Sequence, residues 1–384
     1  MSLRLWKIRR ELKRAIPKTL ETLAEPVRHL TFLPLYDLRK KRLMRVTEGD
    51  RAPGEEIGIY LIFPDRGLLP SHLTMIDAMI RQGISPLVVS NLPLSDQDRD
   101  TLAARAFRVI ERPNVGYDFG GYRDAILSIA ALLPELRCLW VLNDSAWLVD
   151  QTGQWFAEAR TTGTDFTGCV SNFGIRKVDM QDHARIAWDF NPGNRRFHYV
   201  SSSWRIGAAI LRDPGFLRFW RRLQIRDSKQ LTVRRGEVGF SQWVLRHGFT
   251  HGATHEIADL PARLDALSDV ALDDVTRHLL MIDPAGEAEK DVVLAIDPAT
   301  PAGRQARITL CLAATARFGY VIAMPHFILH HGQLPFFKKS VLKAAPQTVA
   351  LALDIMNDLP AGTGPMIRAE ALNRAKTPRP SASA

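Results

Sequence analysis

The segment Arg108–Asp150, RVIERPNVGYDFGGYRDAILSIAALLPELRCLWVLNDSAWLVD, decides the fold of this chain. Its pattern predicts a strand, a glycine-rich loop, an amphipathic helix, a second strand and a polar tip with a carboxylate. The loop at 114–121 holds three glycines, which let a backbone turn tightly and approach a ligand closely. The second strand, at 139–142, delivers the polar tripeptide NDS at 143–145 to its carboxyl end, where open α/β sheets bind ligands.

The sequence before this segment continues the same alternation. Residues 57–63 and 86–91 are apolar runs typical of buried strands, and residues 71–82 and 98–106 are predicted helices. Together they predict the order β-α-β-α-β-α-β, which favours an α/β fold with a doubly wound, Rossmann-type sheet, right-handed crossovers and helices on both faces. A further strand is expected at 166–171.

Length and composition limit the possible classes of protein. A chain of 384 residues with 46% hydrophobic and 24% charged residues is typical of one large or two ordinary folded domains. Its three cysteines are far apart and fit neither a disulfide framework nor a zinc site, which favours buried thiols in a reducing compartment. The first residues are charged, so we expect no secretory signal, and no apolar run approaches the roughly 18 residues that span a bilayer. We therefore expect a cytoplasmic protein.

The net charge of +10 is concentrated at one end of the chain. Residues 1–51 hold 14 Lys and Arg against 6 Asp and Glu, so they carry +8 of that charge. This distribution disfavours a nucleic-acid-binding protein, in which basic residues cover the folded domain. A helix lying on an anionic membrane surface, on the inner face of the plasma membrane, is one interpretation of the basic arm. A solvated leader is the other.

Changes in composition predict five parts. Residues 256–299 hold 11 acidic and 3 basic residues and are interpreted as part of a small helical insertion on the periphery. The Pro-, Ala- and Ser-rich end of the chain predicts disorder. The predicted parts are a basic N-terminal arm (1–53), the main α/β domain (54–255), the acidic insertion (256–307), the C-terminal part of the main domain (308–358) and a disordered tail (359–384).

Two polar segments are candidates for binding a charged ligand. Asn143 and Asp144 lie at a strand end and offer oxygen atoms that suit Mg²⁺ or Mn²⁺, although an aspartate after a strand is also a common turn or cap. The glycine-rich loop offers backbone N–H groups to a diphosphate, with Arg123 as counter-charge. A plain turn with Asp118 as helix cap is the alternative for this loop.

Two further residues are candidates for proton transfer or metal binding. Glu237 is a candidate general base, since a carboxylate in a dry cleft can take a proton from a sugar hydroxyl. The alternative is an ordinary acidic residue in the first turn of a helix. His255 is a candidate metal ligand or proton shuttle, against a loop histidine whose hydrogen bonds are satisfied within the fold.

Several motifs in order resemble one family. The pattern Asn114-x-Gly-x-Asp118-x₄-Arg-Asp followed by LNDS at 142–145 resembles the rhamnan synthesis F family of bacterial polysaccharide glycosyltransferases. Further matching segments are SSW at 202–204, FLRFW at 216–220, GEVGFS at 236–241, GF at 248–249, MPH at 324–326, PFFKK at 335–339 and Pro346. The resemblance covers about residues 57–255 and 318–346.

The resemblance implies a GT-A-like fold that uses a nucleotide-diphosphate sugar together with a divalent cation, Mg²⁺ or Mn²⁺. Its implied metal ligand is Asp144, beside the candidate ligand His255 named above, and Glu237 is the implied catalytic base. Asn143 stands where related proteins carry an aspartate, so metal-independent transfer stays open. The implied nucleotide-sugar-binding residues are Asn114, Gly116, Asp118, Arg123, Asp124 and Asn143.

The sequence as a whole predicts an enzyme, a glycosyltransferase of the hexosyltransferase type. It would move a sugar such as rhamnose or another deoxyhexose to a growing cell-surface polysaccharide or lipid-linked glycan. The alternative is a catalytically degenerate GT-A module that binds glycan or a partner transferase. Inversion or retention at the transferred sugar is left open.

Overall fold

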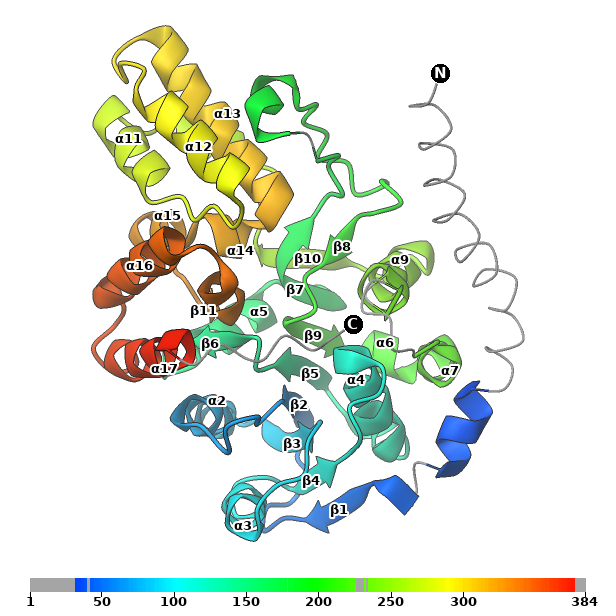
Figure 1. The fold of residues 1–384 in the computed structure, drawn as a ribbon. Coiled ribbons are helices and arrows are strands. Elements are labelled where there is room, and N and C mark those ends of the chain that lie inside the picture. The colour runs from blue at the N-terminus through cyan, green and yellow to red at the C-terminus, as the bar shows by residue number, and fades with distance from the viewer. Residues whose placement is uncertain (1–31, 40–41, 178, 226–230, 233, 377–384) are drawn as a thin grey trace, which may run out of the picture.

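The computed structural model describes residues 32–39, 42–177, 179–225, 231–232 and 234–376. Within these ranges, one mixed sheet contains nine strands in the order β1-β4-β3-β2-β5-β9-β7-β10, with β8 paired to β7 (Figure 1). The strands are β1 Arg45–Glu48, β2 Glu56–Ile62, β3 Ser85–Ser90, β4 Arg108–Glu111, β5 Cys138–Asn143, β7 Phe166–Asn172, β8 His198–Tyr199, β9 Ser203–Gly207 and β10 His251–His255.

Four parallel strands, β4, β3, β2 and β5, form the first half of the sheet. All seven residues of β2 are buried, as expected for a central parallel strand that helices cover on both faces. Figure 1 shows α2 and α5 on one face and α4, α6, α7 and α9 on the other. The bounds of these helices and of α3 are α2 Pro70–Arg81, α3 Asp96–Ala103, α4 Tyr117–Ser128, α5 Gln154–Thr161, α6 Ala208–Arg212, α7 Pro214–Arg222 and α9 Gly239–Arg246.

The predicted α/β alternation is confirmed through β7, and the second half of the sheet is mixed. Strand β9 lies between β5 and β7 and runs antiparallel to both, whereas β10 runs parallel to β7. Aromatic residues of β9, α7 and α9 pack into one cluster on this side. The ring centroids of Trp204 and Trp220 each lie 5.5 Å from that of Phe240. The pairings of β9 with β5 and β7, and of β10 with β7, make the main sheet continuous from β1 to β10.

A small second sheet brings the C-terminal part of the chain to the main one. Strand β6, Ala146–Leu148, directly follows the polar tip after β5 and pairs antiparallel with β11, Phe336–Lys338. The segments after β11 are η4 Lys339–Lys343, α16 Pro346–Ile355, η5 Met356–Asp358 and α17 Gly364–Lys376. This pairing joins residues that are about 190 positions apart in the sequence.

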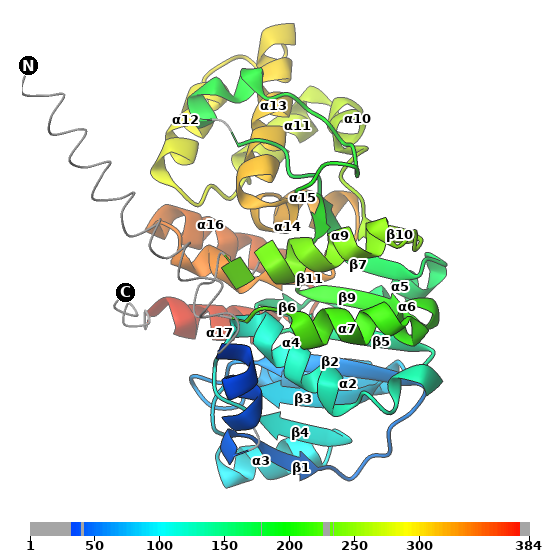
Figure 2. The same ribbon diagram turned by 90° about the vertical axis from the view of Figure 1, so that its right-hand side faces the viewer.

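The acidic segment forms a helical lobe beyond the β10 side of the sheet, with α14 and α15 nearer to the sheet (Figures 1 and 2). Its last helix, α13, runs past residue 307, where the predicted insertion ends. The elements are α10 Leu260–Asp265, α11 Asp269–Arg277, α12 Pro284–Leu294, α13 Pro301–Phe318, α14 Tyr320–Ala323 and α15 Pro325–His331, with the short turns η1 Leu133–Glu135 and η2 Met180–Arg185 elsewhere.

Two predicted boundaries differ from the structure. Residues 45–48 of the predicted arm form the edge strand β1, which pairs with β4. The expectation of a disordered tail from residue 359 is wrong for α17, because Ile367 and Ala371 are buried on one face and the Glu370 carboxylate accepts a hydrogen bond from Trp147 Nε1 (2.8 Å). Residues 1–31 of the arm and 377–384 of the tail lie outside the described residues.

Glu56, at the start of β2, makes the sheet sensitive to acid. Its buried carboxylate accepts hydrogen bonds from Arg160, Arg137 and Trp140. Burial raises the pKa of Glu56, but the bonds from Arg160 and Trp140 outweigh burial and bring it down to about 2. Because the folded-state pKa is depressed, this stabilisation is present above the unfolded value and is lost as pH falls towards 2.

We therefore expect Glu56→Gln to flatten the loss of stability between about pH 4.5 and 2, the window set by this shift. The measurement is urea unfolding of both proteins at a series of pH values. The exposed Glu135→Gln is the control and should leave the wild-type profile unchanged. A wild-type acid profile in Glu56→Gln would contradict the assignment.

Within the described residues, no helix combines the length and apolar composition needed to cross a bilayer.

Candidate active site

A cleft of about 1060 Å³ lies at the carboxyl ends of the parallel strands. Its lining contains the end of β2 and the segments after β3, β4 and β5, which is where open α/β sheets bind ligands. Residues of α13 and α14 line the opposite wall, so the helical lobe helps to enclose the cleft. Of the predicted site residues, it is lined by Asn114, Asp118, Asp144 and Glu237.

Asp144 lies in the cleft directly after β5. Its Oδ2 accepts a hydrogen bond from Phe63 N (3.0 Å) and lies 3.3 Å from His72 Nε2. Leu69 N donates to His72 Nδ1 (3.2 Å), so Nε2 carries the proton and donates to Asp144. Burial raises the pKa of Asp144, but the His72 bond and the nearby charge of Lys339 lower it to about 2. The carboxylate is therefore ionised at neutral pH.

Asn143 connects the polar tip to the glycine-rich loop. Its Nδ2 donates to Tyr122 OH (2.8 Å) and to Asp118 Oδ2 (3.3 Å), while its Oδ1 accepts from Ser145 N (3.1 Å). An aspartate at this position would place a second carboxylate against Asp118, and the two would repel. This contact explains why an asparagine fits the position. Asn143 is buried and does not line the cleft. It therefore positions the glycine-rich loop through its hydrogen bond to Asp118.

Glu237 faces the cleft from a π-helical turn, η3 Arg234–Val238, directly before α9. Its Oε1 accepts a hydrogen bond from Ser201 N (2.6 Å), and its Oε2 lies 3.7 Å from His198 Nε2. The side chain is 12% exposed. The carboxylate is therefore held by one oxygen, with the second oxygen directed at His198, which also lines the cleft.

Two lysines, which the sequence did not assign to the site, enter the cleft from β11 and η4. The β6–β11 pairing sets Lys338 opposite Ala146, and Lys339 N donates to Ser145 O (3.0 Å). Lys338 Nζ donates to Ser145 Oγ (3.2 Å). Burial lowers the pKa of both ammonium groups, against the opposing effect of nearby carboxylates. The motif PFFKK contains both lysines, but its sequence does not show that they lie in the cleft. The β6–β11 register places them beside the carboxyl end of β5.

The Lys339 side chain is the most informative group in the cleft. Its Nζ is buried and has no hydrogen-bond partner among the described residues, and it lies 5.3 Å from the centre of the Trp147 ring. Leaving a buried charged donor unsatisfied is costly, so such a group indicates a missing acceptor. A ligand with anionic oxygens would supply that acceptor.

The charges that line the cleft favour an anionic ligand as well. Three carboxylates line it: Asp118, Asp144 and Glu237. They face seven cationic side chains, those of Arg66, Lys177, Arg317, Lys338, Lys339, Lys343 and Arg374. A cleft lined by an excess of one charge sign concentrates ligands of the opposite sign.

Arg123 and Asp124 do not line the cleft, which corrects their assignment to the nucleotide-sugar site. Arg123 makes a bidentate pair with Asp37 (2.8 and 2.7 Å) and donates from Nε to Trp220 O. Asp124 accepts from Arg112 Nε (2.8 Å), and the side chains of both are fully buried. Both residues therefore bind the segment at 32–39 to α4, and the predicted counter-charge role of Arg123 does not fit.

His255 also lies outside the cleft lining. Its Nε2 is 2.6 Å from Gln333 O, and its Nδ1 is 3.0 Å from Thr254 Oγ1. Burial lowers the pKa of His255. Both ring nitrogens thus have partners within the fold, so the alternative of a satisfied loop histidine fits the structure and a metal-ligand role does not.

Gly116 shapes the loop without lining the cleft. It has a positive φ of 74°, and a Cβ there would lie 2.6 Å from Ile225 Cβ. The next residue, Tyr117, has φ 50°, an uncommon conformation for a non-glycine residue, and its side chain does line the cleft. Such backbone conformations cluster at functional sites. The turn directs Asn114, Tyr117 and Asp118 into the cleft.

The donor groups near Asp144 fit a divalent cation only in part. One carboxylate is present, and its Oδ2 already accepts from Phe63 and His72. In the described ranges, the clusters of three possible metal-ligating side chains do not include Asp144. Mg²⁺ is often held by one or two carboxylates together with substrate phosphates. The site therefore suits a cation that a bound diphosphate also coordinates, not one that the protein holds alone.

Comparison with known families shows what this chain resembles. The model of the family described as rhamnan synthesis protein F matches residues 87–274, which confirms the resemblance seen in the motifs. The chain is also similar to the uncharacterized protein y4gN of Sinorhizobium fredii (strain NBRC 101917 / NGR234), with 28% identity over 205 residues. That match covers 53% of this chain and 49% of y4gN, so the chain spans about half the length of this relative.

Three solved structures show some similarity to this chain. Core-mannan synthase A of Aspergillus fumigatus, in a Mn/GDP form, matches with 8% identity and a TM-score of 0.26 over 46% of this chain and 66% of its own. The mannosyltransferase PcManGT of Pyrobaculum calidifontis, in complex with GDP-Man and Mn²⁺, matches with 12% identity and a TM-score of 0.30 over 93% and 98%. TarS 1–349 of S. aureus matches with 9% identity and a TM-score of 0.25 over 83% and 88%. These TM-scores are too low to support a conclusion about this chain.

Proposed function

We propose that this chain is a glycosyltransferase that takes a sugar from a nucleotide-diphosphate donor bound in the cleft. The observation that carries the proposal is the buried, unpartnered ammonium of Lys339 in a cationic cleft that also contains Glu237. The family match over residues 87–274 supports the same conclusion. We expect the donor diphosphate to lie against Lys338 and Lys339, with Asn114 and Asp118 nearer to the nucleoside or the sugar.

The proposed reaction moves one proton and one glycosyl group. The acceptor hydroxyl attacks the anomeric carbon, its proton passes to Glu237, and the bond from that carbon to the diphosphate breaks. The backbone N–H of Ser201 holds Oε1, which leaves Oε2 as the proton acceptor. The Lys338 and Lys339 ammonium groups stabilise the negative charge on the departing nucleotide diphosphate. A divalent cation shared by Asp144 and the diphosphate would supply further charge neutralisation.

The sugar and the acceptor are also part of the proposal. The family name supports rhamnose or a related deoxyhexose as the sugar, and a growing cell-surface polysaccharide or lipid-linked glycan as the acceptor. A lipid-linked acceptor would fit a basic arm over residues 1–51 that meets the anionic inner face of the plasma membrane.

A second candidate function is that of a binding module, which binds its ligand without catalysing a reaction. It is favoured by one observation: Asp144 Oδ2 is already engaged by Phe63 and His72, as in a site that needs no catalytic metal. Such a module would bind a nucleotide-diphosphate sugar or glycan and release no product.

A donor screen tests the proposal and separates the two candidates. The full chain is incubated with nucleotide-diphosphate sugars of different bases and sugars, with and without Mn²⁺, and release of the nucleotide diphosphate is measured alongside donor binding. Release from one donor class is the expected result, and its dependence on Mn²⁺ decides whether a cation takes part. Binding without release, for every donor and with membrane-extracted acceptor glycans added, would favour the binding module. Neither binding nor release would contradict the transferase and would leave, of the second candidate, only a module that binds glycan.

A further inference from the structure

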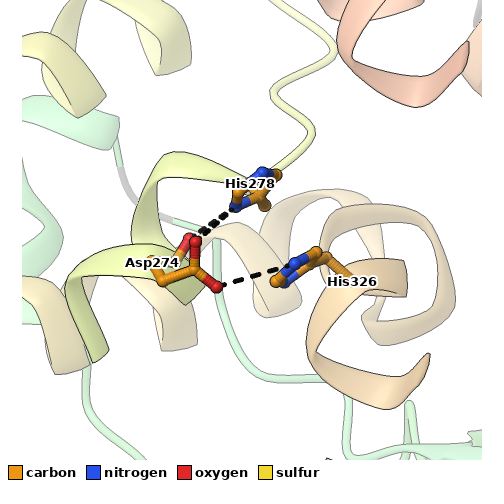
Figure 3. A group of neighbouring side chains, drawn as sticks. All are labelled: Asp274, His278 and His326. Atoms are coloured by element: carbon orange, nitrogen blue, oxygen red, sulfur yellow. Dashed lines mark hydrogen bonds and ion pairs between the residues drawn. The ribbon is translucent and has the colours of Figure 1, made fainter. Parts of the chain in front are cut away.

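A second cluster of metal-ligating side chains lies away from the cleft, between α11 and α15. Asp274 and His278 are four residues apart on α11 and its C-terminal cap, and His326 and His330 are four residues apart on α15. Residues at this spacing share one face of a helix. Figure 3 shows Asp274, His278 and His326 directed toward one another. The fifth member, Asp358, comes from η5, and none of the five lines the cleft.

In each of the two sets of three residues, the possible ligand atoms lie within 4.8 Å of one another. Asp274 Oδ1 lies 3.2 Å from His278 Nδ1, and Asp274 Oδ2 lies 3.6 Å from His326 Nε2. On the other side, His330 Nε2 lies 3.3 Å from Asp358 Oδ2. Metal–ligand bonds of about 2.0–2.1 Å in a tetrahedron give ligand–ligand separations of about 3.3–3.4 Å. The two ligand sets share His326.

His326 gives an independent indication of a missing ligand. The residue is 8% exposed, and its Nδ1 is buried with no hydrogen-bond partner among the described residues. Its ring stacks on that of His278, with centroids 3.9 Å apart, and its centroid lies 4.3 Å from that of the His330 ring. A buried polar atom without a partner marks a place where an ion or another ligand is missing.

The environment of His278 suits metal binding as well. Its Nδ1 lies 2.8 Å from the backbone carbonyl of Asp274. Metal-ligating histidines commonly donate one ring N–H to a carbonyl, which fixes the tautomer and leaves the other nitrogen with its lone pair. This bond therefore fixes the tautomer of His278 and leaves Nε2 with the lone pair that a metal needs. Because the His278 ring stacks on that of His326, the two rings have to turn apart to direct their lone pairs at one ion. The Asp274 side chain is 51% exposed, which gives an ion access from solvent.

We propose that Asp274, His278 and His326 form a binding site for one divalent transition-metal ion of the zinc class, with water at the remaining coordination position. Imidazole ligands select Zn²⁺ and its neighbours over Mg²⁺ or Ca²⁺, which prefer oxygen ligands. The ion would link α11 to α15. Because α15 follows α14, which helps to line the cleft, the site would stabilise the junction between the helical lobe and the sheet.

The test is zinc binding by the full chain. The protein is stripped with chelator, dialysed against buffered Zn²⁺ and then assayed for bound metal and for melting temperature. We expect one tightly bound Zn²⁺ per chain and a melting temperature raised by a few degrees, since a ligand that binds only the native state stabilises it. Mg²⁺ at the same concentration should give neither effect. Co²⁺ should bind and give the visible absorption of tetrahedral cobalt.

Variants at the cluster locate the ion. His278→Ala and His326→Gln should each weaken Zn²⁺ binding by at least about 10- to 100-fold, the loss typical for disturbing even an outer-shell partner. His331→Ala is the matched control, because His331 is an exposed histidine on the same helix and belongs to neither ligand set. Circular dichroism in chelator confirms that each variant is folded. If the wild-type chain binds no stoichiometric zinc, or if both cluster variants bind it as the wild type does, the proposal is wrong.

Discussion

Replacing Glu237 by glutamine is expected to lower kcat by roughly 10²- to 10⁴-fold, the contribution typical of a general base. The glutamine keeps a carbonyl oxygen that can accept the Ser201 N–H bond, so the π-helical turn should retain its position. It cannot take a proton from the acceptor hydroxyl. Donor affinity should therefore stay close to the wild-type value while release of nucleotide diphosphate falls.

Glu135→Gln is the matched control for this prediction, because Glu135 is an exposed glutamate outside the cleft lining. It should leave both kcat and donor affinity unchanged. Comparing kcat with the dissociation constant of the donor separates loss of proton transfer from loss of binding. A wild-type kcat in Glu237→Gln would remove Glu237 from the mechanism.

Replacing Asp124 by alanine is expected to destabilise the fold by about 3–5 kcal/mol, the usual result of breaking a buried ion pair from one side. Asp124 and Arg112 are fully buried and joined by a 2.8 Å bond, and Tyr36 OH donates to the same carboxylate (2.6 Å). Without Asp124, the Arg112 guanidinium keeps its bond to Asn91 but loses its only counter-charge within 4 Å in the described part of the chain.

The measurement is urea unfolding of Asp124→Ala against the wild type. Asp182→Ala is the matched control, since Asp182 pairs with Arg185 at the surface, where the two side chains are 49% and 80% exposed. An exposed pair of this kind contributes about 0–1 kcal/mol. A change for Asp124→Ala as small as that of the control would contradict the account of the Tyr36–Arg112–Asp124 cluster.

The first half of the sheet could be predicted because its signals are local. The apolar runs at 57–63 and 139–142 are short and strongly β-forming, and each lies next to a helix with clear spacing. The placement of β9 between β5 and β7 could not be predicted, because antiparallel insertion depends on pairing between distant segments. The same limit applies to Lys338 and Lys339, which reach the cleft through the β6–β11 register.

The errors at the site have a common physical origin. Arg123 and Asp124 follow a glycine-rich loop, and their polarity suggested a ligand. Their actual partners are Asp37, Tyr36 and Arg112, two of which lie in a segment that composition alone marks as a solvated arm. A buried ion pair and a ligand-binding pair have the same residue types in sequence, and only the burial of both partners separates them.

The C-terminal helix was missed for a similar reason. Its composition is rich in small and charged residues, which alone favours disorder. In the structure Glu370 accepts bonds from Ser71 Oγ (2.7 Å) and Trp147 Nε1 (2.8 Å), and these contacts hold α17 against α2 and β6. Neither partner can be identified from the residues around Glu370.

Calorimetric titration of a nucleotide diphosphate into the wild type and Lys339→Met tests the central claim, that the cleft binds the donor through its diphosphate. The control is Lys376→Met, which replaces an exposed lysine on α17. A hydrogen bond to a charged group contributes about 1.5–3 kcal/mol, so Lys339→Met should bind roughly 10- to 100-fold more weakly while Lys376→Met binds as the wild type does. Equal affinity in all three proteins, or no binding of any nucleotide diphosphate to the folded wild type, would contradict the account.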